Sequence, residues 1–177
     1  MSLAKLLVPL DQLLRAERID YALIGAYAAA AWGESRGTRD VDLLVRARDV
    51  ERLAEALRRT GARFELRHGD DDDPIATVLR LDLGTEAETL QVDILAGIRG
   101  EAAGLLERVR LLETESLRVP VAAPEDMVLL KLLAGSVRDV EDAQGIIRVQ
   151  GQALDRALLR SLAPPRLLPQ LDRLLSD

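Results

Sequence analysis

Asp40 and Asp42 stand two positions apart in GESRGTRDVDLLV (33–45), directly before an apolar run. If residues 39–46 form a strand, the period of two points both carboxylates to the same side of a sheet. Two like charges in line cost free energy unless a cation, a positive side chain or water lies in front of them. The pair is therefore either a solvated strand end or half of a metal site.

A third acid, Asp93, is isolated within the apolar segment LQVDIL (90–95). Mg²⁺ favours oxygen ligands and often bridges one or two carboxylates to substrate phosphates. Two metals about 4 Å apart would activate an attacking hydroxyl and stabilise a leaving pyrophosphate. We therefore predict that Asp40, Asp42 and Asp93 bind Mg²⁺ (or Mn²⁺), with a capped or paired strand-end acid as the alternative for Asp93.

Gly25 follows a short apolar strand and precedes an alanine-rich, helix-prone segment. A glycine lets the backbone approach a ligand closely, and the N-terminus of the next helix offers free N–H groups and a positive dipole end. This arrangement predicts a phosphate cradle beside the two aspartates.

The apolar spacing predicts an α/β protein whose sheet carries these residues. The predicted helices are 2–18, 26–32, 49–60, 101–110, one opening at Pro124, 138–149, 152–162 and 166–175. The predicted strands are 21–24, 39–46, 63–67, 77–83, 89–95 and 117–121, with the fourth and fifth paired as a hairpin through a turn at 84–88. We expect a mixed α/β core over 1–100 and a helical C-terminal region over 101–177.

Composition excludes several classes of function. The net charge of −6 and the aromatic content of 2% argue against an extended nucleic-acid-binding face, although not against a local one. The absence of cysteine excludes disulfides, thiol nucleophiles and cysteine-based metal sites. No apolar run approaches the roughly 20 residues that span a bilayer. Because the N-terminal segment has the pattern of an amphipathic helix, we expect a cytoplasmic protein without membrane contact.

Two stretches resemble a known family. YALIGAYAAAAWGESRGTRDVDLLV and the later QVDIL resemble the polymerase-β-type nucleotidyltransferase superfamily, and PEDMVLLKLLAGSVRDVEDAQGII is similar to its AbiEii-like branch. That branch includes toxins of type IV toxin–antitoxin systems, and the resemblance covers about residues 21–147. It implies a nucleotidyltransferase fold, in which a mixed β-sheet is flanked by helices and a helical part follows at the C-terminus.

The resemblance also implies roles for individual residues. Asp40 and Asp42 would bind metal, and Asp93 would be the third ligand and the candidate base. The nucleotide would be bound by Gly25, Ala26, Arg36, Thr38 and Lys131. Lys131 would reach the phosphates as a compact cation, or it would be an ordinary ion pair to Asp126 or Glu125.

Two further features of the resemblance leave alternatives open. Arg138, Asp139 and Asp142 match the R-D-x-x-D pattern of the branch, with both acids on one helix face, and are either partners of Lys131 or part of the site. Ala26 stands where the superfamily motif reads Gly-Ser or Gly-Gly. Without a serine hydroxyl one phosphate hydrogen bond is lost, a net effect on the order of 1 kcal/mol.

Other candidate residues have plainer interpretations. The aspartates at 70–73 are expected to lie in a solvated loop, and His68, the single histidine, on the surface. Tyr27 and Trp32 are expected to pack against the sheet.

The predicted function is the metal-dependent transfer of NMP from an NTP to an acceptor hydroxyl on RNA or tRNA, a protein or a small molecule. The resemblance makes a toxin role and an antitoxin partner part of this hypothesis. The alternative is a catalytically inactive module that binds a nucleotide or a partner, which the alanine at position 26 favours.

Overall fold

A single seven-stranded sheet forms the centre of the computed structural model, which describes residues 3–33, 37, 40–85 and 88–176. Its order is β3-β4-β5-β2-β1-β7-β6. The strands are β1 (Tyr21–Ile24), β2 (Asp40–Val45), β3 (Phe64–His68), β4 (Ile75–Thr85), β5 (Glu88–Ile98), β6 (Arg110–Glu113) and β7 (Arg118–Val121). The sheet thus includes two strands, β6 and β7, from the region after residue 100 that was expected to be helical.

The sheet is mixed, and its middle strands carry the predicted acids. β2 runs antiparallel to β1 and parallel to β5, while β1 is parallel to β7. The predicted hairpin is confirmed, because β4 and β5 pair antiparallel from Ile75↔Ile98 to Thr85↔Glu88. Both strands are longer than predicted: β4 spans 75–85 where 77–83 was expected, and β5 spans 88–98 where 89–95 was expected.

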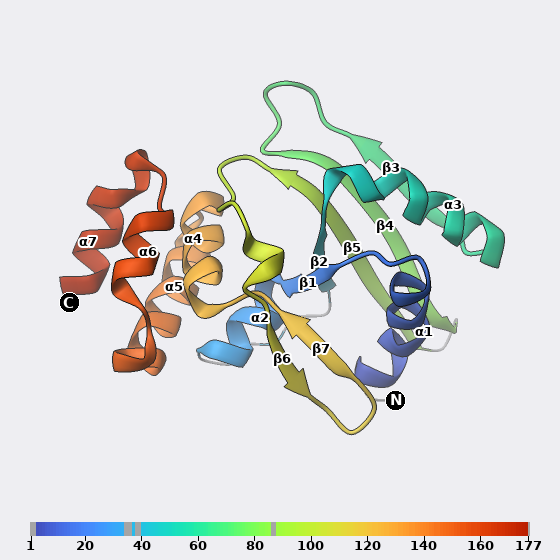
Figure 1. The fold of residues 1–177 in the computed structure, drawn as a ribbon, viewed down its shortest axis with the longest axis horizontal. Coiled ribbons are helices and arrows are strands. Elements are labelled where there is room, and N and C mark those ends of the chain that lie inside the picture. The colour runs from blue at the N-terminus through green and yellow to red at the C-terminus, as the bar shows by residue number, and fades with distance from the viewer. Residues whose placement is uncertain (1–2, 34–36, 38–39, 86–87, 177) are drawn as a thin grey trace.

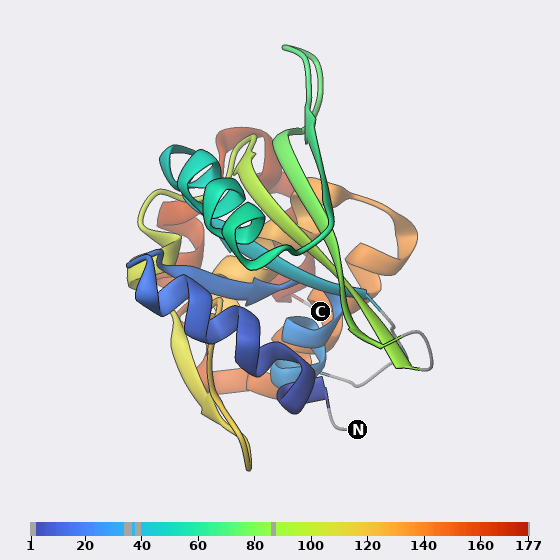
Figure 2. The same cartoon turned by 90° about the vertical axis from the view of Figure 1, so that its right-hand side faces the viewer.

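Seven helices lie around the sheet in the described chain: α1 (Leu3–Ala16), α2 (Gly25–Trp32), α3 (Val50–Thr60), α4 (Pro124–Ala134), α5 (Val137–Gln150), α6 (Arg156–Leu162) and α7 (Leu168–Ser176). Figure 1 shows α4–α7 gathered at one end of the molecule, with α1 and α3 at the other, and Figure 2 shows α1 and α3 in front of the sheet when the view is turned. None of the described helices combines the length and the apolar character that crossing a membrane requires. The predicted mixed α/β fold is confirmed.

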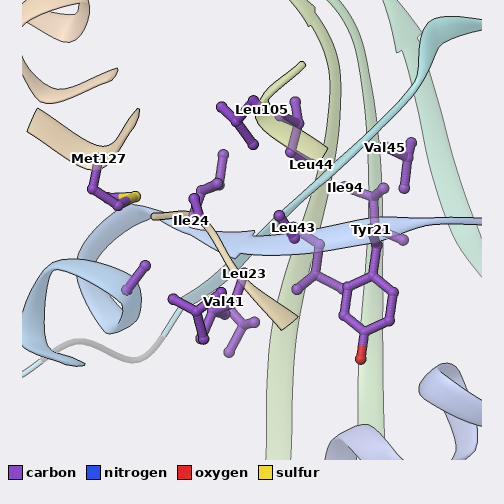
Figure 3. Packing of buried hydrophobic residues seen from close by; sticks show 14 of the residues in the cluster. Tyr21, Leu23, Ile24, Val41, Leu43, Leu44, Val45, Ile94, Leu105 and Met127 are labelled. Carbon is purple, nitrogen blue, oxygen red and sulfur yellow. The ribbon is translucent and has the colours of Figure 1, made fainter. Parts of the chain in front are cut away.

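The hydrophobic core is built around β1 and β2. Residues 21–24 are buried throughout, as are Val41 and residues 43–45. Figure 3 shows these side chains packed with Ile94 of β5, Leu105 and Met127 of α4. Residues 40 and 42 break the apolar run of β2, so the two acids occupy the end of a strand whose remainder is fixed by burial.

Trp32 ties α2 to two distant segments. Its indole Nε1 donates to the Ala122 carbonyl at 2.7 Å, and its own carbonyl accepts from Gln150 Nε2 at 2.7 Å. The predicted packing role of Trp32 therefore includes two hydrogen bonds that hold α2 against the start of α4 and the end of α5.

The helix predicted over 101–110 is wrong. This segment contains only a short 3₁₀ helix, Leu105–Glu107, and β6 begins at Arg110. Gly100 and Gly104 adopt left-handed conformations with φ +82° and φ +76°, which interrupt a helix. Arg108 then pairs with the fully buried Asp126 at 2.6 and 3.0 Å and donates to the Ala103 carbonyl at 2.7 Å. Tertiary pairing of one arginine thus overrides the local helical pattern.

Candidate active site

Four charged residues form a row across the sheet. Glu65 of β3 lies opposite Arg80 of β4, Arg80 opposite Asp93 of β5, and Asp93 opposite Asp42 of β2. Ile24, the last residue of β1, lies opposite Asp42 and ends the row. Directly opposed residues project from the same face, so the charges −, +, −, − lie side by side. The register therefore brings Asp42 and Asp93 together, although they are 51 positions apart (93 − 42).

Asp42 is the electrostatically strained member of the row. Burial and, next, the negative charge of Asp93 raise the pKa of the Asp42 carboxyl from 3.8 to about 6. The charges of Lys131 and Arg80 oppose this shift without cancelling it. A half-buried carboxylate beside a second carboxylate is a position at which a cation lowers the free energy.

Asp93 is bound by an arginine that the sequence analysis did not single out. Arg80 Nε donates to Asp93 Oδ1 at 2.7 Å and Arg80 Nη2 donates to Asp93 Oδ2 at 2.8 Å. The hydrogen bonds to Asp93 raise the pKa of Arg80. The available signal was the alternating pattern of residues 77–83, in which Arg80 is the one cation, together with the hairpin pairing to 89–95.

Asp40 is placed differently from the other two predicted ligands. It is exposed at the first position of β2 and lies opposite Gln91, while its charge still acts on Asp42 and Arg80. Across the described ranges, no group of three or more histidine, aspartate or glutamate residues is arranged to hold a metal ion. Asp42 and Asp93 remain as a two-carboxylate donor set, which suits Mg²⁺ because this ion is often held by one or two carboxylates plus substrate phosphates.

Gly25 is required by the geometry of Asp42. Its φ is +66°, and a Cβ at this position would overlap the Asp42 carboxylate. Only glycine therefore allows α2 to start directly against the end of β2. Ala26, the next residue, is buried in the first turn of α2. The helix N-terminus and the carboxylate are thus adjacent. The phosphate cradle itself stays a prediction.

A cavity of about 660 Å³ opens beside Gly25 and Asp42. Lys131 and Asp139 also line it, and much of its wall is apolar, including Leu95 and Met127. Three charged residues not predicted as site residues line the cavity as well: Asp72, Arg99 and Arg166. Asp72 belongs to the exposed acidic loop, which is ordered by hydrogen bonds from the Asp70 and Asp72 amides to the Asp73 and Asp70 carboxylates. This predicted surface loop therefore also borders the cavity.

Lys131 lies in the cavity wall as a buried, doubly paired cation. Its Nζ is 2.9 Å from Asp139 Oδ1 and 2.8 Å from Asp142 Oδ2. Both acids of the R-D-x-x-D pattern are thus partners of Lys131. The alternative partners are occupied elsewhere, because Asp126 binds Arg108 and Glu125 accepts from the Asp155 amide.

Asp139 links Lys131 to the start of α5. Its carboxylate accepts from the Ser136 hydroxyl at 2.6 Å, and the Ser136 hydroxyl in turn accepts from the Asp139 amide, so the two residues form a capping box. Burial raises the pKa of Asp139, but hydrogen bonds from Ser136 and Lys131 outweigh it and leave a net lowering. Lys131, whose charge acts on Asp42, is therefore held in place by the capping box of α5.

The remaining candidates lie apart from this cluster or outside the description. His68 is exposed, with Nδ1 3.4 Å from the Thr77 hydroxyl, and Arg138 is exposed on α5. Arg36 and Thr38, predicted to bind the nucleotide, lie outside the residues that the structure describes.

Solved structures share this architecture. The antibiotic-resistance factor ANT(2'')-Ia matches with a TM-score of 0.58 and 13% sequence identity, with 89% of each chain covered. Its complex with adenylyl-2''-tobramycin matches with a TM-score of 0.57 and 12% identity, over 89% of this chain and 97% of that one. A Thermotoga maritima protein described as a nucleotidyltransferase matches with a TM-score of 0.55 and 18% identity, over 80% and 91% of the two chains. At these identities the likeness establishes a common fold.

Among curated proteins, no sequence matches this chain. The family model of the nucleotidyl transferase AbiEii toxin of the type IV TA system matches residues 10–164, which include every strand of the sheet and the helices α2 to α6. The chain belongs to the AbiEii nucleotidyl transferase toxin family.

Proposed function

We propose that this protein transfers NMP from an NTP to an acceptor hydroxyl, with a divalent metal ion held by Asp42 and Asp93. The observation that carries the proposal is the pairing of these two carboxylates across β2 and β5, with Asp42 and Gly25 lining a cavity of about 660 Å³. The cavity volume lies within the range of small-molecule sites, about 300–1,000 Å³. The family supports a transferase. We infer the metal from the two carboxylates, and the NTP from the cavity beside the start of α2.

The start of α2, Lys131 and Asp93 have distinct parts in this reaction. The free N–H groups at the start of α2 bind the triphosphate, and Gly25 lets it approach the backbone. Lys131, held by its two acids, lines the same cavity and attracts the phosphates. The acceptor oxygen attacks the α-phosphorus, the bond to pyrophosphate breaks, and the hydroxyl proton passes to Asp93. A bound Mg²⁺ would offset charge that develops on the phosphates.

We infer that Asp40 contributes mainly through its charge. Its exposed carboxylate stands two residues before Asp42 on the same strand and adds to the negative potential there. We therefore expect its replacement to weaken metal binding less than replacement of Asp42.

Three classes of acceptor are candidates for the transferred NMP. ANT(2'')-Ia has been solved with an adenylylated aminoglycoside, adenylyl-2''-tobramycin, so small hydroxylated molecules belong among the candidates. RNA and protein hydroxyls are the other two classes, and the family's type IV toxin–antitoxin assignment supports a cellular target whose modification arrests growth. In that setting a partner antitoxin relieves the arrest.

The test is a transfer assay with each α-labelled NTP, Mg²⁺ or Mn²⁺, and separate pools of total RNA, total protein and aminoglycosides. We expect label to enter one pool with the wild type and to be lost with Asp42→Asn. Asp71→Asn is the matched control, because Asp71 lies in the exposed loop and does not line the cavity.

Two outcomes would contradict the proposal. One is wild-type protein that binds an NTP with Mn²⁺ yet labels no pool. That result would favour the catalytically inactive binding module, which the alanine at position 26 also favours. The other is transfer that survives Asp42→Asn, which would place the chemistry elsewhere. Growth arrest on expression that also disappears with Asp42→Asn would connect the transfer to a toxin role.

A further inference from the structure

We propose that Arg80 is a built-in counter-ion that competes with the divalent metal for Asp93 and must leave this carboxylate before the metal site is complete. The inference rests on the proposed function in one respect, namely that Asp93 is a metal ligand. It adds a positioning residue that acts through Asp93.

The contact itself is of the kind that blocks a ligand. Arg80 uses two nitrogens, 2.7 and 2.8 Å from the two oxygens of Asp93, so both oxygens are engaged at once. Paired Arg–carboxylate bonds of this type fix the carboxylate plane and are stronger than neutral hydrogen bonds. A divalent ion on the same oxygens would lie close to the guanidinium, and two cations on one carboxylate repel each other.

The counter-ion is needed because the row would otherwise hold two adjacent uncompensated carboxylates. Asp93 has only 14% of its side chain exposed and lies directly opposite Asp42. Lys131 also attracts Asp42, but its ammonium is shared with Asp139 and Asp142, whose two negative charges exceed its own. Arg80 therefore supplies the single positive charge within this row of four residues when no metal is present.

The structure also provides a place for Arg80 to go. Its side chain is 43% exposed, so the guanidinium can move without breaking the core. On the far side from Asp93, Glu65 of β3 lies directly opposite Arg80. Glu65 is half exposed and pairs with Arg67, and its charge already acts on Arg80. A released Arg80 thus finds a second carboxylate one strand away.

The experiment measures binding of Mn²⁺ alone, without nucleotide, by the loss of the free-ion EPR signal. We expect Arg80→Gln to bind Mn²⁺ about tenfold more tightly than the wild type, because binding no longer breaks a charge-assisted pair. Arg160→Gln is the matched control, since Arg160 Nε donates to Asp172 Oδ1 at 2.8 Å between α6 and α7, away from the row, and is similarly exposed. Its affinity should stay within about twofold of the wild type.

Thermal unfolding gives a second readout that a merely structural role would not produce. Without metal, Arg80→Gln should lower Tm, because Asp42 and Asp93 lose their counter-ion. With Mn²⁺, its Tm should rise by more than that of the wild type. If Arg80→Gln fails to fold, Arg80→Lys keeps the charge but loses the two-bonded contact, and its Mn²⁺ affinity should rise as well, by a smaller factor.

The outcomes separate this inference from the proposed function. If Asp42→Asn weakens Mn²⁺ binding while the arginine variants bind no more tightly than the wild type, the role of Arg80 is overturned and the metal site stands. If neither the wild type nor Arg80→Gln binds Mn²⁺, or if Asp42→Asn leaves the binding unchanged, the two-carboxylate site fails and the role of Arg80 falls with it.

Discussion

Replacing Asp42 by asparagine is expected to stabilise the metal-free protein while it abolishes transfer. The reason is that the Asp42 carboxylate is ionised at neutral pH at a position where burial and Asp93 disfavour its charge. Asparagine has nearly the same shape and carries no charge, so the variant removes the penalty and keeps the packing of β2.

The size of the effect follows from the pKa. A rise from 3.8 to about 6 is a shift of roughly two units. At 1.36 kcal/mol per unit, the free energy of unfolding of the variant should exceed that of the wild type by at most about 3 kcal/mol. The asparagine amide loses the attraction of Lys131 and must be dehydrated, so we expect about 1–2 kcal/mol in practice.

The sign of the pH dependence makes the prediction specific. Because the pKa of Asp42 is raised in the folded state, its destabilising effect is fully present above pH 6 and disappears as the pH falls towards 3.8. Urea unfolding in EDTA at about pH 7.5 and about pH 4.5 measures the difference between Asp42→Asn and the wild type at each end of this window. The difference should be large at the higher pH and small at the lower.

A matched variant separates this effect from the loss of net negative charge. Asp71→Asn removes one charge in the exposed loop and should change the free energy of unfolding by less than about 0.5 kcal/mol at both pH values. An Asp42→Asn protein that is no more stable than the wild type at pH 7.5, or a difference that grows towards acid, would refute the electrostatic account of this site.

Two further substitutions test other parts of the structure. Gly25→Ala should lose NTP binding and about 1–3 kcal/mol of stability, because the alanine must adopt φ +66° and its Cβ would clash with Asp42. The control is Gly61→Ala, at φ +75° with open space around it, which should show only the backbone cost. Urea unfolding and NTP titration measure both variants. Arg108→Met should cost about 3–5 kcal/mol of stability, since it leaves the fully buried Asp126 without its cation. The Mn²⁺ affinity of the folded protein should not change. A loss of stability under about 1 kcal/mol would contradict the role of Arg108 as the counter-ion of Asp126.

The fold was largely predictable because its strands and helices carry strong apolar periods. Residues 21–24 and 40–45 are buried on both faces or alternate clearly, so local pattern and tertiary packing agree there. The segment after Gly100 was not predictable in the same way. Its helical pattern is overruled by two left-handed glycines and by the pairing of Arg108 with Asp126, which lies 18 residues further along the chain.

The candidate site was predictable only as far as its residue types. The sequence indicates that Asp42, Asp93 and Gly25 share a site, since each departs from its apolar surroundings. It does not indicate that Arg80 binds Asp93, because that contact depends on the exact register of β4 against β5. The same limit applies to Lys131, whose two partners are chosen by how α5 packs on α4.

The two hydrogen bonds of Trp32 have a consequence for the order of assembly during synthesis. The carbonyl of residue 122 and the side chain of residue 150, which fix α2 in place, emerge from the ribosome long after Gly25 and Asp42. The first 100 residues therefore carry Asp42 and Asp93 but lack the two groups that anchor α2. Under the proposed function, a nascent or truncated chain that ends before α5 is complete should show no transfer.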